Sequence, residues 1–424
     1  AVPDLHRAQP GVSRAGWPAR AGEPLDALLA AEECAALLVV AKSGSDPDIA
    51  PFVRGAHLGR SLVVAPRGAA PRLGFFTPME REEAAATGLD LLTPERLEVA
   101  RFAGERPAPG AFLAGVLGAA LAGSGVASGR IALAGHPAAG ELLAAVRILE
   151  GEGWTFADGN GLVRRFRQEK VAWEVVEARR VAAATCEAFH RLASRLAAAR
   201  EVAGQLHEGG EPLTVARLRR EVALVCAEHG LEQPSGNLIA PGEEGGVPHN
   251  TGTPERVLRP GETLIVDLFP KGLLYADCTR TFCVGPVPEA VAAAHAAVAE
   301  ALALAHREAR PGRRGWDLQE ATCAFLAGRG YPTPVTHPGT LRGYVHGLGH
   351  GVGHELHESP AFTKQAGAEG VLGVGDLVTL EPGLYEPGEG GYGIRLENMV
   401  WFGPDGPENL TPLPYDLDPA AWAR

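Results

Sequence analysis

The chain has 424 residues, of which 46% are hydrophobic and 21% are charged, which is typical of a soluble globular protein with two or three domains. Its formal net charge of −12 argues against a nucleic-acid-binding protein, because such proteins usually carry a basic excess or a basic stripe. The six cysteines are dispersed without a CxxC pair, which favours reduced thiols in a cytoplasmic protein over a disulfide framework.

The first part of the chain alternates short apolar runs with helical patterns. Residues 1–25 predict an extended lead-in without a signal peptide. Strands are then expected at 36–41, 61–66, 72–77 and 131–135, and helices at 79–87, 110–122 and 138–149. The uncharged segment 107–129 is dominated by alanine and glycine, so we expect a packed helix and no membrane span. This alternation predicts a small α/β domain.

The second part of the chain begins where glycine gives way to charge, near residues 160–167. We therefore predict two domains, 1–165 and 166–424, and an α+β fold overall. Helices are expected at 168–203, 213–229, 287–309 and 315–329. A strand-rich region is expected from about 344 to 402.

The stretch LIVDLFPKGLLYADCTRTFC, residues 264–283, reads as two apolar strands around a turn near Gly272. With that turn, Asp267 and Asp277 lie directly across the hairpin on one face, with Cβ atoms about 5 Å apart. Two carboxylates among apolar strand residues are costly unless a positive group lies between them. A pair of divalent metal ions is the simplest candidate for that group.

A glycine-rich run, HGLGHGVGHELH, places His346, His350, His354 and His357 within twelve residues. Its alternating glycines make a helix unfavourable, since each costs about 1 kcal/mol in a helix interior. Four histidines on such a turn are difficult to explain by packing alone. Glycine also lets the backbone approach a ligand or a metal closely.

A second hairpin is expected in DLVTLEPGLYEPGEGGYGIRLENMVWF, residues 376–402. Glu381 and Glu397 could oppose each other across it, because their midpoint falls in a glycine-rich turn, and Arg395 lies on the face of Glu397. The four acids and the histidine cluster together favour a dinuclear metal site. Two divalent cations would balance the four negative charges.

The motifs VDLF, DCTRTF, HGLGHGVG, LEPGLY and GIRLEN, in this order, resemble those of the pita-bread metallopeptidases, over about residues 168–403. The resemblance is strongest to the Xaa-Pro peptidase branch, which includes aminopeptidase P and prolidase. It implies a C-terminal pita-bread domain preceded by a smaller, creatinase-like α/β domain.

Carried over position by position, the resemblance implies that two divalent metal ions (Mn, Co, Zn or Fe) are bound by Asp267, Asp277, His350, Glu381 and Glu397. It implies further catalytic roles for Glu381 as general base, and for His249, His346, His357 and Arg395 around the substrate and the metal ligands.

Two departures from the family pattern are visible. The spacing of Asp267 and Asp277 is one residue shorter than usual, and Phe269–Pro270 stands where a glycine is common. His354 is an additional histidine, which we expect to be a surface or dimer-contact residue rather than part of a substrate pocket.

The resemblance implies a dinuclear metal-dependent exopeptidase that hydrolyses Xaa-Pro bonds at the N-terminus of peptides or in dipeptides. A carboxypeptidase using the same site from the other peptide end is the alternative. A metal-free creatinase-like hydrolase and a non-catalytic binding protein are further readings, although relatives of both kinds typically lack metal ligands. Expected partners are a peptide substrate and a second copy in a homodimer, with no nucleic acid and no membrane.

Overall fold

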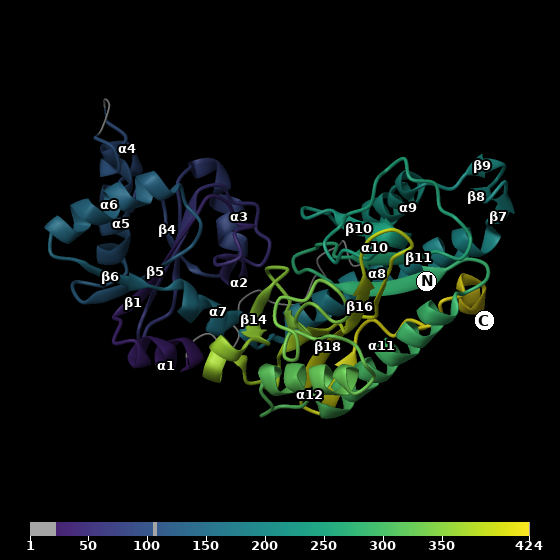
Figure 1. The fold of residues 1–424 in the computed structure, drawn as a ribbon. Helices are drawn as coiled ribbons and strands as arrows, with labels where there is room; N and C mark the ends of the chain where they lie inside the picture. The colour runs from purple at the N-terminus through teal and green to yellow at the C-terminus, as the bar shows by residue number, and fades with distance from the viewer. Residues whose placement is uncertain (1–22, 105–107, 424) are drawn as a thin grey trace. The chain divides into compact units, whose positions relative to one another are not determined.

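The computed structural model describes residues 23–104 and 108–423, so the lead-in predicted for residues 1–25 lies almost entirely outside the described residues. The chain divides into two compact units, Ala1–Arg167 and Gln168–Arg424, which Figure 1 shows in purple to blue and in teal to yellow. Each unit has two hydrophobic clusters of its own.

The first unit contains a six-stranded sheet in the order β4-β3-β2-β1-β5-β6. Its strands are β1 (Ala36–Ala41), β2 (Ser61–Pro66), β3 (Arg72–Phe75), β4 (Asp90–Leu92), β5 (Arg130–Ala134) and β6 (Thr155–Asp158). Its helices are α1 (Glu23–Ala31), α2 (Ala50–Val53), η1 (Pro78–Glu80), α3 (Arg81–Ala86), α4 (Val99–Phe102), α5 (Ala111–Gly123), α6 (Ala139–Gly151) and α7 (Asn160–Gln168).

Alternation along the central strands divides the side chains of this sheet between two hydrophobic clusters. In β1, Leu37 and Val39 pack with residues of α1, α2, α3 and α7, whereas Leu38 and Val40 pack with residues of α5 and α6. Figure 1 shows α5 and α6 side by side on their face of the sheet. The predicted α/β layering is therefore present, with helices on both faces.

The glycine-to-charge segment 160–167, where the domain boundary was predicted, lies in the amphipathic helix α7. The uncharged segment predicted as a packed helix forms α5, and residue 107 lies outside the described residues. Within the described ranges, no helix combines the length and hydropathy needed to cross a bilayer.

The second unit contains sheets in the orders β10-β11-β12, β14-β13-β15-β18-β19, β16-β17 and β7-β8-β9. Its strands are β7 (Arg200–Val202), β8 (Gln205–Glu208), β9 (Glu211–Pro212), β10 (Asn237–Pro241), β11 (Thr263–Leu268), β12 (Cys278–Cys283), β13 (His350–Gly351), β14 (Glu358–Ala361), β15 (Leu377–Leu380), β16 (Gly383–Glu386), β17 (Tyr392–Arg395), β18 (Asn398–Gly403) and β19 (Gly406–Asn409). Its helices are α8 (Ala172–Ala198), α9 (Val215–Glu228), α10 (Gly242–Gly245), α11 (Glu289–Glu308), α12 (Gly315–Ala327), η2 (Lys364–Gly370) and η3 (Pro419–Ala423).

Two hydrophobic clusters support the sheets of this unit. One joins α8 and α9 to β10, β11 and β12, and the other joins α11 and α12 to β15, β16, β17 and β18. The helix predicted over 168–203 is shorter at both ends, because Glu174 caps its start and residues 200–202 pair with β8 as a strand. As expected, the histidine run does not form a helix.

Candidate metal centre

A cavity of about 270 Å³ opens in the second unit, where residues of β10, β11 and β17, residues next to the ends of β12, β15 and β18, and the histidine run converge. It is lined by Leu238, Pro248, His249, Asp267, Phe269, Asp277, His346, Gly347, Gly349, His350, Leu356, His357, Glu381, Arg395 and Glu397. All nine site residues predicted from the sequence are among them. The structure therefore brings these side chains together, and their roles remain proposals.

The first hairpin differs from the predicted pairing. Asp267 pairs with Thr279, and Asp277 precedes β12 instead of lying opposite Asp267. The turn between the strands is longer than a tight hairpin, and Lys271 in it exchanges backbone hydrogen bonds with Glu232. Because Asp277 is two residues from Thr279, both aspartates still face the cavity, so the error in register does not change the face.

The second hairpin has the expected pairing. Leu380 pairs with Asn398 and Gly383 pairs with Arg395, and this common register places Glu381 opposite Glu397 between two ladder segments. Pro382 lies in the interruption, where it has no N–H to contribute to a ladder. The interruption lets two glutamates leave the apolar strand surface and reach the cavity.

His350 presents a lone pair to the acids of the cavity. Its Nδ1 lies 3.0 Å from the carbonyl oxygen of Gly351, which can only accept, so Nδ1 carries the proton. Burial, followed by the nearby His357, lowers the pKa of His350 to about 3, so the ring is neutral. Its unprotonated Nε2 then faces Asp277 Oδ2 at 3.6 Å and Glu381 Oε1 at 3.5 Å. Three groups of lone pairs at this range repel one another unless a cation or a proton lies between them.

The same arrangement raises the pKa values of the carboxyl groups. Burial and then the charge of Glu397 raise the pKa of Asp277 well above its usual value. Burial and then Glu381 do the same for Glu397, and burial raises the pKa of Glu381 to about 8 despite the nearby Arg395. Without a cation, protons must therefore occupy part of this cluster at neutral pH.

One buried carboxylate oxygen of this cavity has no hydrogen-bond partner among the described residues. Asp267 Oδ1 is buried and makes no hydrogen bond, while Oδ2 accepts from Arg395 Nη2 at 2.7 Å. Ligand atoms of Asp277, His350 and Glu397 all lie within 4.8 Å of one another. A mixed carboxylate and imidazole set of this kind suits Mn, Co, Fe or Zn, so the residues present fit divalent cations.

Two hydroxyl groups that the sequence reasoning did not single out connect the site. Thr279 donates to Glu397 Oε2 at 2.7 Å and accepts from Arg395 Nε at 3.0 Å. Tyr385 accepts from Arg395 Nη1 at 2.7 Å and lies 2.8 Å from Nε2 of His346. Both residues stand inside the quoted motifs DCTRTF and LEPGLY, so the motifs carried the signal.

The remaining predicted histidines form the wall of the cavity. His346 has its Nδ1 2.7 Å from the carbonyl of Gly347, and burial lowers its pKa to about 3. The ring of His357 packs edge-on against that of His350, with centroids 4.3 Å apart. His249 is exposed at the rim of the cavity.

The expectation for His354 was wrong. The residue is only 2% exposed and does not line the cavity, so it is neither a surface group nor part of the pocket. Its Nε2 lies 2.7 Å from Oε1 of Glu174, in the first turn of α8. Sequence periodicity could not pair two residues 180 positions apart.

Arg280 lies fully buried behind the site and fixes the backbone of Glu397. Its guanidinium donates to the carbonyl oxygens of Glu397, Pro414, Thr411 and Leu413. It also donates to the side chain of Asn398 and lies 4.8 Å from the ring of Tyr415. Residues 411–415 therefore complete the structure around Glu397.

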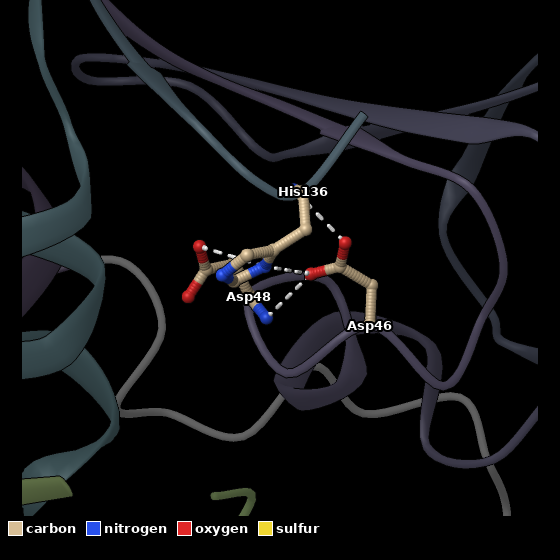
Figure 2. A group of neighbouring side chains, drawn as sticks. All are labelled: Asp46, Asp48 and His136. Atoms are coloured by element: carbon tan, nitrogen blue, oxygen red, sulfur yellow. Dashed lines mark hydrogen bonds and ion pairs between the residues drawn. The ribbon is translucent and has the colours of Figure 1, made fainter. Parts of the chain in front are cut away.

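A second cluster with metal-ligand side chains lies in the first unit, where Figure 2 shows Asp46, Asp48 and His136. Asp46 accepts from the backbone N–H of Asp48 and of His136, each at 3.0 Å. Asp48 accepts from Arg167 at 2.9 Å and from the backbone of Gly135 at 3.1 Å. Because every carboxylate oxygen already accepts from a protein donor, the cluster is explained as a hydrogen-bonded connection between two loops.

A family model for metallopeptidase family M24 matches residues 176–403, which is more than half of the chain. Among curated proteins, the Xaa-Pro dipeptidase of Pyrococcus furiosus is 32% identical over 216 residues. That match covers 49% of this chain and 57% of the relative, so the chain matches little more than half of the relative's length.

Solved structures resemble the whole fold. The Xaa-Pro dipeptidase from Bacillus anthracis aligns with a TM-score of 0.71 at 19% identity, over 93% of this chain and 98% of that one. The X-Pro aminopeptidase from Thermotoga maritima aligns with a TM-score of 0.68 at 21% identity, again over 93% and 98%. At this identity the likeness concerns the fold alone, and it confirms the predicted pita-bread fold with a preceding α/β unit.

Proposed function

Because the chain belongs to metallopeptidase family M24, we propose that it is a metal-dependent exopeptidase that hydrolyses Xaa-Pro bonds, at the N-terminus of peptides or in dipeptides. The observation that carries the proposal is the neutral His350, whose Nε2 lone pair faces Asp277 and Glu381 at 3.6 and 3.5 Å. Relatives named as an Xaa-Pro dipeptidase and an Xaa-Pro aminopeptidase support this substrate class.

The proposed metal ligands are Asp267, Asp277, His350, Glu381 and Glu397, which would hold two divalent ions (Mn, Co, Zn or Fe). Bound divalent cations would polarise the scissile carbonyl and lower the pKa of water.

The side chains around these ligands have distinct proposed tasks. Glu381 accepts the proton of the attacking water and passes it to the leaving amine. His249 and His357 line the cavity where they can donate hydrogen bonds to the oxygen that gains charge. Arg395 and His346 hold Asp267 and Tyr385 in place.

Proline recognition has to come from shape, because the imide nitrogen of an Xaa-Pro bond carries no hydrogen to donate. Leu238, Phe269 and Leu356 line the same cavity as the histidines and give it an apolar surface. A pyrrolidine ring can bury its methylene groups against such a surface.

The test is product analysis on Xaa-Pro dipeptides, Xaa-Pro-Yaa tripeptides and analogues blocked at either end, with Mn or Co added to the protein. Release of the N-terminal residue from substrates with a free amine supports the proposal, and blocking that amine should abolish it. Cleavage that requires a free C-terminal carboxylate would instead establish the carboxypeptidase alternative. Asp277→Asn should lose both metal and hydrolysis.

We also propose that the two domains divide at 165/166 and that the first domain is creatinase-like. We further propose that the protein is a homodimer located in the cytoplasm.

A further inference from the structure

The turn between β13 and β14, residues 352–357, follows His350 and ends at His357, two residues of the proposed site. Strand β13 is only two residues long, and its pairing with β14 shifts register between His350 and Gly351. A short and irregular ladder leaves much of the position of this turn to side-chain contacts. Those contacts come from the first turn of α8.

The first contact joins the tip of the turn to the helix. His354 Nε2 lies 2.7 Å from Glu174 Oε1, and both side chains are almost completely buried, at 1% and 4% exposure. The second oxygen of Glu174 accepts from the backbone N–H of Val171 at 2.7 Å, which fixes the carboxylate in place. Nδ1 of His354 makes no hydrogen bond to the described residues, so one directional bond orients the ring.

The second contact lies at the base of the turn. Lys170 Nζ donates to Glu358 Oε1 at 2.7 Å, and neither side chain is exposed. The other oxygen of Glu358 accepts from the backbone N–H of Glu355, inside the turn. A Cβ at Gly353 would come within 2.7 Å of Lys170 Cε and would overlap Glu358. The turn is thus held at two points by residues 170–174.

We propose that His354 is a positioning residue, and that the His354–Glu174 and Lys170–Glu358 contacts fix the His350 and His357 rings relative to each other. The edge-on packing of these rings, with centroids 4.3 Å apart, means that a displaced turn moves one imidazole against the other. This inference rests on the proposed function, because it takes His350 as a metal ligand and His357 as a substrate contact.

The experiment compares His354→Leu with Leu192→Ala, a core substitution in α8, the helix that carries Glu174. Metal-stripped proteins are titrated with Mn²⁺ alone and followed by the Mn²⁺ spin-resonance signal, with urea unfolding as the measure of stability. His354→Leu should raise the Kd for Mn²⁺ by about 10–100-fold, as is typical when a group that orients a metal ligand is lost. Leu192→Ala should leave the Kd within about twofold even though it lowers stability.

Two further variants separate positioning from general destabilisation. His354→Gln retains an N–H donor at nearly the reach of Nε2 and should restore most of the affinity. The pair Glu174→Leu with His354→Leu leaves no buried charge without a partner, so it should fold, but it lacks the directional bond. Wild-type affinity in that double variant, or equal losses in His354→Leu and Leu192→Ala, would overturn the positioning role.

The two proposals fail in different ways. If His354→Leu weakens Mn²⁺ binding but the wild-type protein hydrolyses no Xaa-Pro substrate, the positioning role stands and the proposed function falls. If the wild-type protein hydrolyses these substrates while His354→Leu binds Mn²⁺ normally, the positioning role falls alone. A wild-type protein that binds none of Mn, Co or Zn contradicts both.

Discussion

Hydroxyl groups at single residues hold the charged side chains of the pocket in place. Thr279 connects Glu397 to Arg395, and Tyr385 connects Arg395 to His346. Each hydroxyl both donates and accepts, so it can join an acceptor to a donor without adding charge. Such groups keep ligand oxygens oriented towards the space between them.

Thr279→Val should test this role, because it replaces the hydroxyl with a methyl group of similar size. We expect the affinity for Mn²⁺ to fall by about 10–100-fold, since Glu397 loses its orienting donor. Isothermal titration of metal-stripped protein measures the change. Thr279→Ser keeps the hydroxyl and serves as the control, so equal affinities in the two variants would contradict the role.

At the scale of residues, the acids and imidazoles of the pocket were easier to predict than the residues that form hydrogen bonds around them. Carboxylates and a histidine cluster on apolar strands are conspicuous, because their burial needs an explanation. Thr279 and Tyr385 are ordinary strand residues in composition, and His354 depends on Glu174, a partner distant in the chain. Only the fold reveals what such residues contact.

At the scale of elements, two hairpins deliver all four acids to the pocket. The pairing of the second was predictable, because its register is the same on both sides of Pro382. The first was misjudged by two residues, because register follows the length of the turn, and the sequence does not show that Lys271 pairs with Glu232. Because side chains alternate between the two faces of a strand, an error of two residues still placed both aspartates on the correct face.

The acids on these hairpins predict how the metal-free protein responds to pH. The pKa of Glu381 is raised to about 8, and those of Asp277 and Glu397 are raised as well, whereas unfolded carboxyls titrate at about 4. Between these values the folded state holds more protons than the unfolded chain, so stability falls as pH rises. We expect a loss on the order of 1–3 kcal/mol between about pH 6 and pH 8.

Urea unfolding of the metal-stripped protein at several pH values measures this slope. Saturating Mn²⁺ should remove most of it, because the cations then neutralise the acids in place of protons. Glu397→Gln should reduce the slope, since one of the coupled carboxyls is gone. A metal-free protein that becomes more stable from pH 6 to pH 8 would show that the acids are not protonated in the folded state.

The glycines of the histidine run give a matched pair of substitutions. A Cβ at Gly349 would overlap the carbonyl oxygen of Thr379, whereas a Cβ at Gly347 would meet nothing within 4 Å. Gly349→Ala should therefore cost about 1–3 kcal/mol in the free energy of unfolding. Gly347→Ala should stay within about 0.5 kcal/mol of the wild type. Denaturant unfolding compares them, and similar losses in both would contradict the close approach.

At the scale of the whole molecule, the chain carries separate cores in its two units. The alternation of short strands and helices in the first unit was predictable in part. Strands β1, β2, β3 and β5 are apolar runs, whereas β4 (DLL) and β6 (TFAD) carry no such run and were not predicted. The second unit was less predictable. Its short strands β7, β9 and β13 have two or three residues, too few for an apolar or alternating pattern to mark them in the sequence.

Calorimetry should resolve this organisation. We expect two unfolding transitions, of which only the one belonging to the second unit moves to higher temperature as Mn²⁺ is added, because ligand binding stabilises only the state that binds it. Glu397→Gln should abolish the shift while leaving the other transition unchanged. A metal-dependent shift of both transitions would mean that the units do not unfold independently.

The carbonyl oxygens that accept hydrogen bonds from Arg280 bear on the order in which the protein folds during its synthesis. Three of them belong to residues 411–414, so a nascent chain that has not yet passed this segment cannot fully satisfy the buried guanidinium behind Glu397. The first unit, whose residues end at Arg167, can fold on the ribosome long before then. The backbone of Glu397 can thus be fixed only after residues 411–414 have been synthesised. A ribosome that stalls before residue 411 leaves a fragment that contains the acids of the pocket but lacks these contacts.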